Sequence, residues 1–181
     1  SITNEGYASN YSRIGLGPKG TIKPDIASYG GDLLRGDNGE MIMKGVNSFS
    51  RNGNVASSSG TSFATARISS LATIIYQNIC KDFKDFSDFN PILLKALIIH
   101  SAKNTDKNLS VEEIGYGIPS TSTEILSYFK NENIKIFNGV MEKNKEIELD
   151  ASFFNYKKDI KIKLTLVYDT EFDYLQKGEY I

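Results

Sequence analysis

The sequence predicts a mixed α/β fold in which a region with helices is followed by a small region of antiparallel strands. Turn-forming residues interrupt the first 60 residues, apolar residues recur at helical spacing from Phe63, and apolar and polar residues alternate beyond about residue 130. Because the pattern changes near 131–136, we expect one domain over 1–132 and an antiparallel β domain over 133–181. A chain of 181 residues is long enough to bury a core without a disulfide or a metal.

The first 60 residues predict short strands joined by long loops. Their turn signals are the glycine-containing stretches GLGPKG, YGGD, GDNGE and RNGN, with only short apolar runs between them. From Phe63 onward the apolar residues return every three or four positions. This spacing predicts a largely buried helix that ends near Cys80.

A second helix is predicted to start after Asn90. Asn90 is a favourable N-cap, Pro91 suits the first helical position, and the stretch ILLKALIIHSA follows with a wide apolar surface that implies burial. A short helix is expected over STEILSYF, residues 122–129. Beyond it, the alternating stretches IKIFNGV, KEIELDASF and DIKIKLTLVYD predict strands with one solvated face.

Composition excludes several classes of function. The 21 basic and 22 acidic side chains leave a net charge of −1, which argues against a charge-driven nucleic-acid partner. No run approaches the roughly 18 apolar residues that a membrane span requires, so no membrane partner is expected. Cys80 is the single cysteine, which rules out an intramolecular disulfide and a paired-cysteine metal site.

Ser62 lies where a glycine-containing loop passes into the first predicted helix, and this position supports two interpretations. In one, a hydroxyl of Ser59, Thr61 or Ser62 caps the helix by accepting a backbone N–H bond. In the other, Ser62 is a nucleophile whose developing oxyanion is stabilised by the first-turn N–H groups and the helix dipole. The small residues Gly60 and Ala64 would let a peptide backbone approach it.

Four stretches together resemble the subtilisin-like serine proteases, the subtilase family. The stretch GTSFATA resembles the signature around that family's nucleophile, and ASNYSRIGLGPKGTIKPDIASYGG resembles a segment upstream of it. Downstream, LLKALIIHSAK and GYGIPS resemble a family helix and a glycine motif, in the family's order. The matches cover about residues 4–130, so the resemblance implies the C-terminal half of a subtilisin-like domain, followed by a small sandwich-like β region that can extend past Ile181.

The resemblance implies a serine endopeptidase that acts on polypeptides through an acyl-enzyme on Ser62. It places Gly60 and Thr61 in the nucleophile turn and leaves Thr61 and the Ser62 backbone N–H as candidates for contact with the oxyanion. The loop 44–59, with Ser58 and Ser59, would line part of the substrate cleft. No metal or organic cofactor is required by such a mechanism.

The resemblance also implies that the site needs residues from outside this chain. The family's triad runs in the order Asp, His, Ser, and no histidine precedes Ser62, so we expect the Asp, the His and the oxyanion Asn upstream of Ser1. The chain by itself is then expected to be inactive. An inactive pseudoprotease, a binding module or a purely structural fragment would carry the same motifs.

The only histidine, His100, suggests another order, Ser, Asp, His, as in α/β-hydrolases. Only 38 positions, mostly helical, separate it from Ser62, and SRNGNVASSS makes a poor strand before the serine, so this scheme is disfavoured. We expect His100 to be a helix residue whose ring is satisfied by a neighbouring carbonyl. Asp25 in KPDI is expected to cap a turn or to pair with a lysine or arginine.

Several residues depart from the family signature or invite a simpler interpretation. Ala66 replaces the proline of the signature, Arg67 its following histidine and Phe63 its methionine, which suggests a divergent bacterial member. Cys80 is expected to be a small buried hydrophobe. A cluster of three acidic residues has calcium-like chemistry but fits a solvated edge better: Asp82, Asp85 and Asp88.

Overall fold

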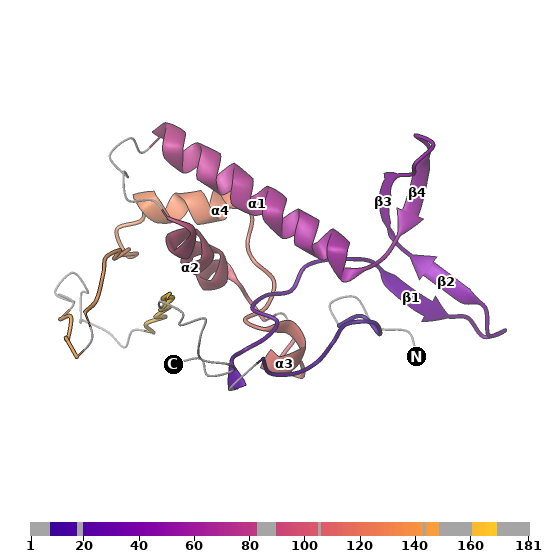
Figure 1. Ribbon diagram of the computed structural model, residues 1–181, viewed down its shortest axis with the longest axis horizontal. Coiled ribbons are helices and arrows are strands. Elements are labelled where there is room, and N and C mark those ends of the chain that lie inside the picture. The colour runs from indigo at the N-terminus through magenta and orange to yellow at the C-terminus, as the bar shows by residue number, and fades with distance from the viewer. Residues whose placement is uncertain are drawn as a thin grey trace, which may run out of the picture.

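In the residues that it describes, the computed structural model combines two small antiparallel sheets with four α-helices and a short 3-10 helix. Figure 1 shows both hairpins beside the start of the long helix α1, with α2 and α4 packed toward its other end. The structure describes residues 8–17, 20–82, 90–104, 106–142, 144–148 and 161–169.

Two hairpins confirm the short strands predicted for the first 60 residues. The first turns at Gly39 and the second at Gly53, and both glycines have positive φ values, 79° and 78°, which other residues adopt at a cost. A register of four residue pairs joins the strands of each hairpin. The strands are β1 (Asp32–Arg35), β2 (Met41–Lys44), β3 (Val46–Phe49) and β4 (Val55–Ser58).

The helix predicted from Phe63 to Cys80 is α1, Thr61–Asp82, but the expectation that it is largely buried is wrong. Ile75 and Ile79 are its buried residues, whereas Ile74 and Tyr76 are exposed. Among the described residues α2 and α4 pack against its later turns, so they cover one stripe of the helix. Periodicity identified the helix correctly but overestimated how much of it is covered.

The second helix, α2, spans Pro91–Ser101, and both of its start signals act as predicted. The Asn90 side-chain oxygen accepts a hydrogen bond from the Leu93 amide at 2.9 Å, and Pro91 opens the helix, where its missing N–H costs nothing. The apolar face of α2 is buried, as expected. Its buried members join residues from α1 and α4 in one core: Ile75, Ile79, Leu93, Leu97, Ile98 and Ile125.

The glycine motif at 115–118 ties the helical part to the KPDI segment. The Tyr116 amide donates to the Asp25 carbonyl and the Ala27 amide to the Gly117 carbonyl, both at 2.9 Å. A side chain at Gly115 would lie 2.2 Å from the Pro24 carbonyl oxygen, so only glycine permits this approach. Three short elements flank the motif: α3 (Val111–Ile114), α4 (Ser122–Ser127), as predicted, and the 3-10 helix η2 (Tyr128–Lys130).

The antiparallel strands predicted beyond residue 130 are not found where the structure describes this region. No strand forms within 131–142, 144–148 or 161–169, and the rest of KEIELDASF and of DIKIKLTLVYD lies outside the described residues. Alternation selects which side chains share a face, but a strand also requires a hydrogen-bonded partner. The segment 161–169 instead contacts the end of α2 through Lys163 and Thr165. The sandwich-like domain over 133–181 stays a prediction.

Adjacent residues of α1 test how the core is built. We expect Ile75→Ala to lower the free energy of unfolding by about 2–5 kcal/mol, because Ile75 is fully buried and its loss leaves a cavity. Ile74→Ala, the matched control at a position 42% exposed, should change it by less than about 1 kcal/mol. Urea unfolding of both variants measures the difference. An equal loss of unfolding free energy in Ile75→Ala and Ile74→Ala would mean that α1 packs through another face.

Candidate active site around Ser62

Ser62 is the second residue of α1, and its side chain is exposed. The first-turn N–H groups of a helix have no intrahelical partner, and the helix dipole places partial positive charge there. Thr61, also exposed, precedes Ser62, and the Thr61 carbonyl accepts a hydrogen bond from the Thr65 hydroxyl at 3.0 Å. The exposed hydroxyl of Ser62 therefore lies in an environment that favours negative charge.

The capping interpretation of this turn does not hold among the described residues. Because α1 begins at Thr61, the residue in the N-cap position is Gly60, which has no side chain to accept a bond. Thr61 and Ser62 are already in the first turn, and the Ser59 hydroxyl oxygen is buried without a hydrogen-bond partner. The turn must therefore be held by something other than a side-chain cap.

A backbone hydrogen bond from the SYGG segment supplies this support. The Gly60 amide donates to the Gly30 carbonyl at 2.8 Å. A side chain at Gly30 would lie 2.6 Å from the Gly60 carbonyl oxygen, closer than atoms tolerate. At Gly31, with φ of +79°, a side chain would lie 2.9 Å from the Ser59 Cβ. Two consecutive glycines thus allow two backbone segments to meet directly beneath the Ser62 turn.

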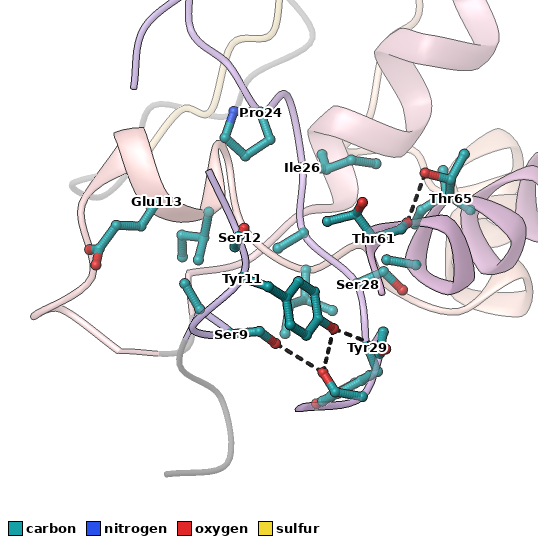
Figure 2. A pocket seen from close by; sticks show the side chains of 18 of the residues that line it. Ser9, Tyr11, Ser12, Pro24, Ile26, Ser28, Tyr29, Thr61, Thr65 and Glu113 are labelled. Atoms are coloured by element: carbon teal, nitrogen blue, oxygen red, sulfur yellow. Dashed lines mark hydrogen bonds between the residues drawn. The ribbon is translucent and has the colours of Figure 1, made fainter. Parts of the chain in front are cut away.

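The segment 8–12 holds these two glycines from their other side. The Tyr11 hydroxyl lies 2.6 Å from the Gly31 carbonyl oxygen and 3.0 Å from that of Gly30, and Ser9 donates to the Gly31 carbonyl at 2.9 Å (Figure 2). Sequence reasoning assigned Tyr11 and Ser9 no function. The available signal was their place in ASNYSRIGLGPKG, a stretch that carries the family resemblance.

A cavity of about 750 Å³ adjoins the turn, between segment 8–12, the KPDI segment and the first turns of α1. Figure 2 shows the Tyr11 ring beside Ser28, with Thr61 and Thr65 on the helix side. Ser62 does not line this cavity, nor do Ser58 and Ser59, which were predicted to line the substrate cleft. The cavity therefore lies next to the Ser62 turn rather than at the Ser62 hydroxyl.

The stretch 44–59, expected as a loop, is mostly the β3–β4 hairpin. Its second strand ends at Ser58, which is half-buried, and only Ser59 and Gly60 separate that strand from α1. The earlier interpretation is wrong because the turn residues around Gly53 close a hairpin instead of a long loop. The expectation that SRNGNVASSS makes a poor strand is also wrong, since β4 forms within it, paired with β3. That Ser58 and Ser59 contact substrate stays a prediction.

His100 is engaged at the end of α2 and is not brought to Ser62. Its Nδ1 lies 2.9 Å from the Thr165 hydroxyl, so a hydroxyl takes the place of the expected carbonyl, and its ring packs edge-on against Tyr128. Lys163 donates to the His100 carbonyl at 2.6 Å. Burial, and then the nearby positive charge of Lys163, lower the pKa of His100 below its ordinary 6.5.

Asp25 forms the ion pairs that its context predicts. Its carboxylate lies 2.5 Å from the Lys23 ammonium and 3.2 Å from that of Lys95. Burial acts to raise the pKa of Asp25, but the hydrogen bonds and positive charges of the two lysines outweigh it and hold that pKa below its ordinary 3.8. Asp25 therefore acts as a paired anion and not as a general base.

The expectation that Cys80 is buried is wrong, because Cys80 is exposed on α1. Ile75 and Ile79 occupy the core positions instead. Of the acidic cluster, Asp82 ends α1, while residues 85 and 88 lie outside the described residues. In the part of the chain that the structure describes, no three acidic, histidine or cysteine side chains gather as metal ligands.

An exposed serine in the first turn of a helix, after a glycine turn, is the arrangement in which serine hydrolases present a nucleophile. The model of the Subtilase family matches residues 1–117, more than half of the chain, and the chain therefore belongs to the subtilase family of serine proteases. Neither a curated protein nor a solved structure matches. The bacterial origin stays a prediction. No helix in the described ranges has the length and apolar character to cross a membrane.

Gly30 tests whether backbone contact sets the turn. We expect Gly30→Ala to lower the free energy of unfolding by about 1–3 kcal/mol, because the new methyl group forces Gly60 away. Gly139→Ala is the matched control, since nothing lies within 4 Å of its added methyl group. Thermal unfolding of both variants provides the comparison. A Gly30→Ala protein as stable as the Gly139→Ala protein would show that the close approach is not required.

His100 makes stability depend on pH. Its lowered pKa means that the folded protein binds a proton less readily than the unfolded chain, so this contribution is present above about pH 6.5 and is lost as the pH falls through the lowered pKa. We expect the free energy of unfolding to decrease between about pH 7.5 and pH 5.5. His100→Gln should flatten this dependence. Parallel curves for the two proteins would contradict the assignment.

Proposed function

We propose that Ser62 is the nucleophile of a serine endopeptidase that hydrolyses polypeptides through an acyl-enzyme. The observation that carries the proposal is the exposed Ser62 hydroxyl at the start of α1, in a chain of the subtilase family. The glycine in the N-cap position supports it, because Ser62 is then not required as a cap.

In this mechanism the Ser62 oxygen attacks the carbonyl carbon of the scissile peptide while a base takes the hydroxyl proton. The resulting oxyanion is stabilised by the Ser62 backbone N–H, by Thr61 and by the helix dipole. The tetrahedral intermediate collapses to an acyl-enzyme as the amine leaves with a proton, and water then releases the acid. Gly60 keeps the turn open for the substrate backbone. The mechanism uses no metal or organic cofactor.

The base and its orienting acid come, in this proposal, from a segment outside these 181 residues. His100 is occupied by Thr165 and Tyr128 at the end of α2, and Asp25 is paired with two lysines. A serine hydroxyl without a base is a poor nucleophile at neutral pH. The 181-residue chain should therefore be inactive alone and should become active with the segment that carries His and Asp.

Ser58 and Ser59 belong to the proposed substrate cleft because they lead directly into the nucleophile turn. Ser58 ends β4, and an extended peptide could lie along that strand toward Ser62. The buried Ser59 hydroxyl is better suited to shaping the turn than to touching the substrate. The cleft would accept polypeptide, in keeping with the family.

A fluorophosphonate probe tests the nucleophile. We expect rapid labelling of the longer polypeptide that includes the sequence encoded before Ser1, and a loss of at least about 1,000-fold in labelling and peptidase activity on Ser62→Ala. Ser70→Ala, an exposed serine on the same helix, is the matched control and should label normally. Mass spectrometry locates the adduct.

Two outcomes would contradict the proposal. Rapid labelling of Ser62 in the 181-residue chain alone would show that no outside base is needed. A longer polypeptide that encodes the His and Asp segments but neither labels nor cleaves peptides would favour a pseudoprotease used as a binding module.

A further inference from the structure

Gly30 and Gly31 of the SYGG segment lie 19 and 20 residues after Tyr11 in the sequence, yet the Tyr11 hydroxyl contacts the carbonyl oxygens of both glycines. Its hydroxyl is 2.6 Å from the Gly31 oxygen and 3.0 Å from the Gly30 oxygen, and it is partly buried. In Figure 2 dashed lines run from the Tyr11 hydroxyl toward the chain next to Tyr29. Tyr11 lines the cavity together with Gly30 and Gly31, and its contacts with their carbonyl oxygens help to fix the position of the segment that carries them.

The Gly30 carbonyl connects Tyr11 to the nucleophile turn. The single proton of the Tyr11 hydroxyl is shared between two carbonyls, with the shorter contact to Gly31 at 2.6 Å and the longer to Gly30 at 3.0 Å, and the Gly30 oxygen also accepts from the Gly60 amide at 2.8 Å. The Gly60 carbonyl in turn accepts from the Phe63 amide at 3.1 Å, within the first turn of α1. The series of contacts therefore runs from Tyr11 through Gly30 and Gly60 to the turn that holds Ser62.

Ser9 also holds the glycine segment, but it does not contact the Gly30 carbonyl that bonds to the Gly60 amide. It donates to the Gly31 carbonyl at 2.9 Å, an oxygen that Tyr11 also contacts. The bond from Gly60 ends on Gly30, and of the two side chains only Tyr11 reaches that carbonyl. The loss of Ser9 thus leaves the link intact, whereas the loss of the Tyr11 hydroxyl removes its anchor.

We propose, resting on the proposed function, that Tyr11 is a positioning residue for Ser62: its hydroxyl contacts both carbonyls of Gly30 and Gly31, holds this main chain where the Gly60 amide meets the Gly30 carbonyl, and so fixes the nucleophile turn. Any Cβ at position 30 would collide with Gly60, so no side chain at this position can limit movement of the turn. The contact of the Tyr11 hydroxyl with the Gly30 and Gly31 carbonyls is what limits movement of the nucleophile turn. A displacement of about 1 Å at a reacting group can cost about 100-fold in rate.

The first test measures amide exchange and does not depend on activity. We expect Tyr11→Phe to speed hydrogen exchange of the Gly60 amide by at least about tenfold, because its acceptor is no longer held. Tyr29→Phe is the matched control: Tyr29 lines the same cavity, but it is 50% exposed and its ring faces Arg67. Ser9→Ala should have a smaller effect than Tyr11→Phe. Unchanged exchange at Gly60 in Tyr11→Phe would overturn the proposal.

The second test uses the longer, active polypeptide. We expect Tyr11→Phe to lower kcat and the rate of fluorophosphonate labelling about tenfold, with KM for a peptide substrate within about twofold of its original value. A merely structural role would instead lower the melting temperature and change kcat and KM together, and that result would overturn the proposal. If the unaltered polypeptide does not label, the proposed function fails, and amide exchange still decides whether Tyr11 positions the turn.

Discussion

The hydrogen bond between the Gly60 amide and the Gly30 carbonyl, 2.8 Å long, joins the two halves of the candidate site. It brings the start of α1 against a segment about 30 residues earlier in the chain. The contact requires glycine at position 30, since a Cβ there would lie 2.6 Å from the Gly60 oxygen, whereas a Cβ at Gly60 would meet nothing closer than 4.0 Å. Glycine at position 30 therefore permits a close main-chain approach that a side chain at this position would block.

The same kind of contact links the other stretches that carry the family resemblance. The Tyr116 amide donates to the Asp25 carbonyl, and the amide and carbonyl of Lys103 pair with those of Ile118 at 3.0 Å. The glycine motif therefore touches both the KPDI segment and the residues that follow α2. Motifs that are far apart in sequence form one connected main-chain network, in which small residues are required because backbone meets backbone.

Local signals in the sequence predicted the elements well, and long-range properties poorly. Asn90 and Pro91 located the start of α2 because a cap and its first turn involve neighbouring residues. The burial of α1 and of Cys80 was misjudged, because periodicity defines an apolar face but not which elements cover it. Within the described residues beyond 130 the expected strands are not found, for a related reason, since pairing depends on a distant partner.

The candidate site shows the same difference between local signals, which the sequence carries, and long-range contacts, which it does not. The order Gly-Thr-Ser at a loop-to-helix boundary supported a cap as well as a nucleophile, and the resemblance of four stretches to the subtilase family is what pointed to Ser62 as the nucleophile. The support from Tyr11 was not predictable, because it depends on contacts across 19 and 20 residues. Sequence reasoning also left the cap and nucleophile interpretations open, and only the first residue of α1 separates them.

A helix start that relies on backbone contact rather than on a side-chain cap has a chemical consequence. A serine hydroxyl that caps a helix accepts a bond that must be broken or rearranged before the oxygen can attack a carbonyl. With Gly60 in the N-cap position and the Gly30 carbonyl holding its amide, the turn keeps its geometry without the Ser62 hydroxyl. In the proposed mechanism, the N–H end of the helix then faces the developing negative charge. In that proposal, stability and reactivity rest on different groups of one short turn, so that a residue as distant as Tyr11 can bear on the position of Ser62 without touching it.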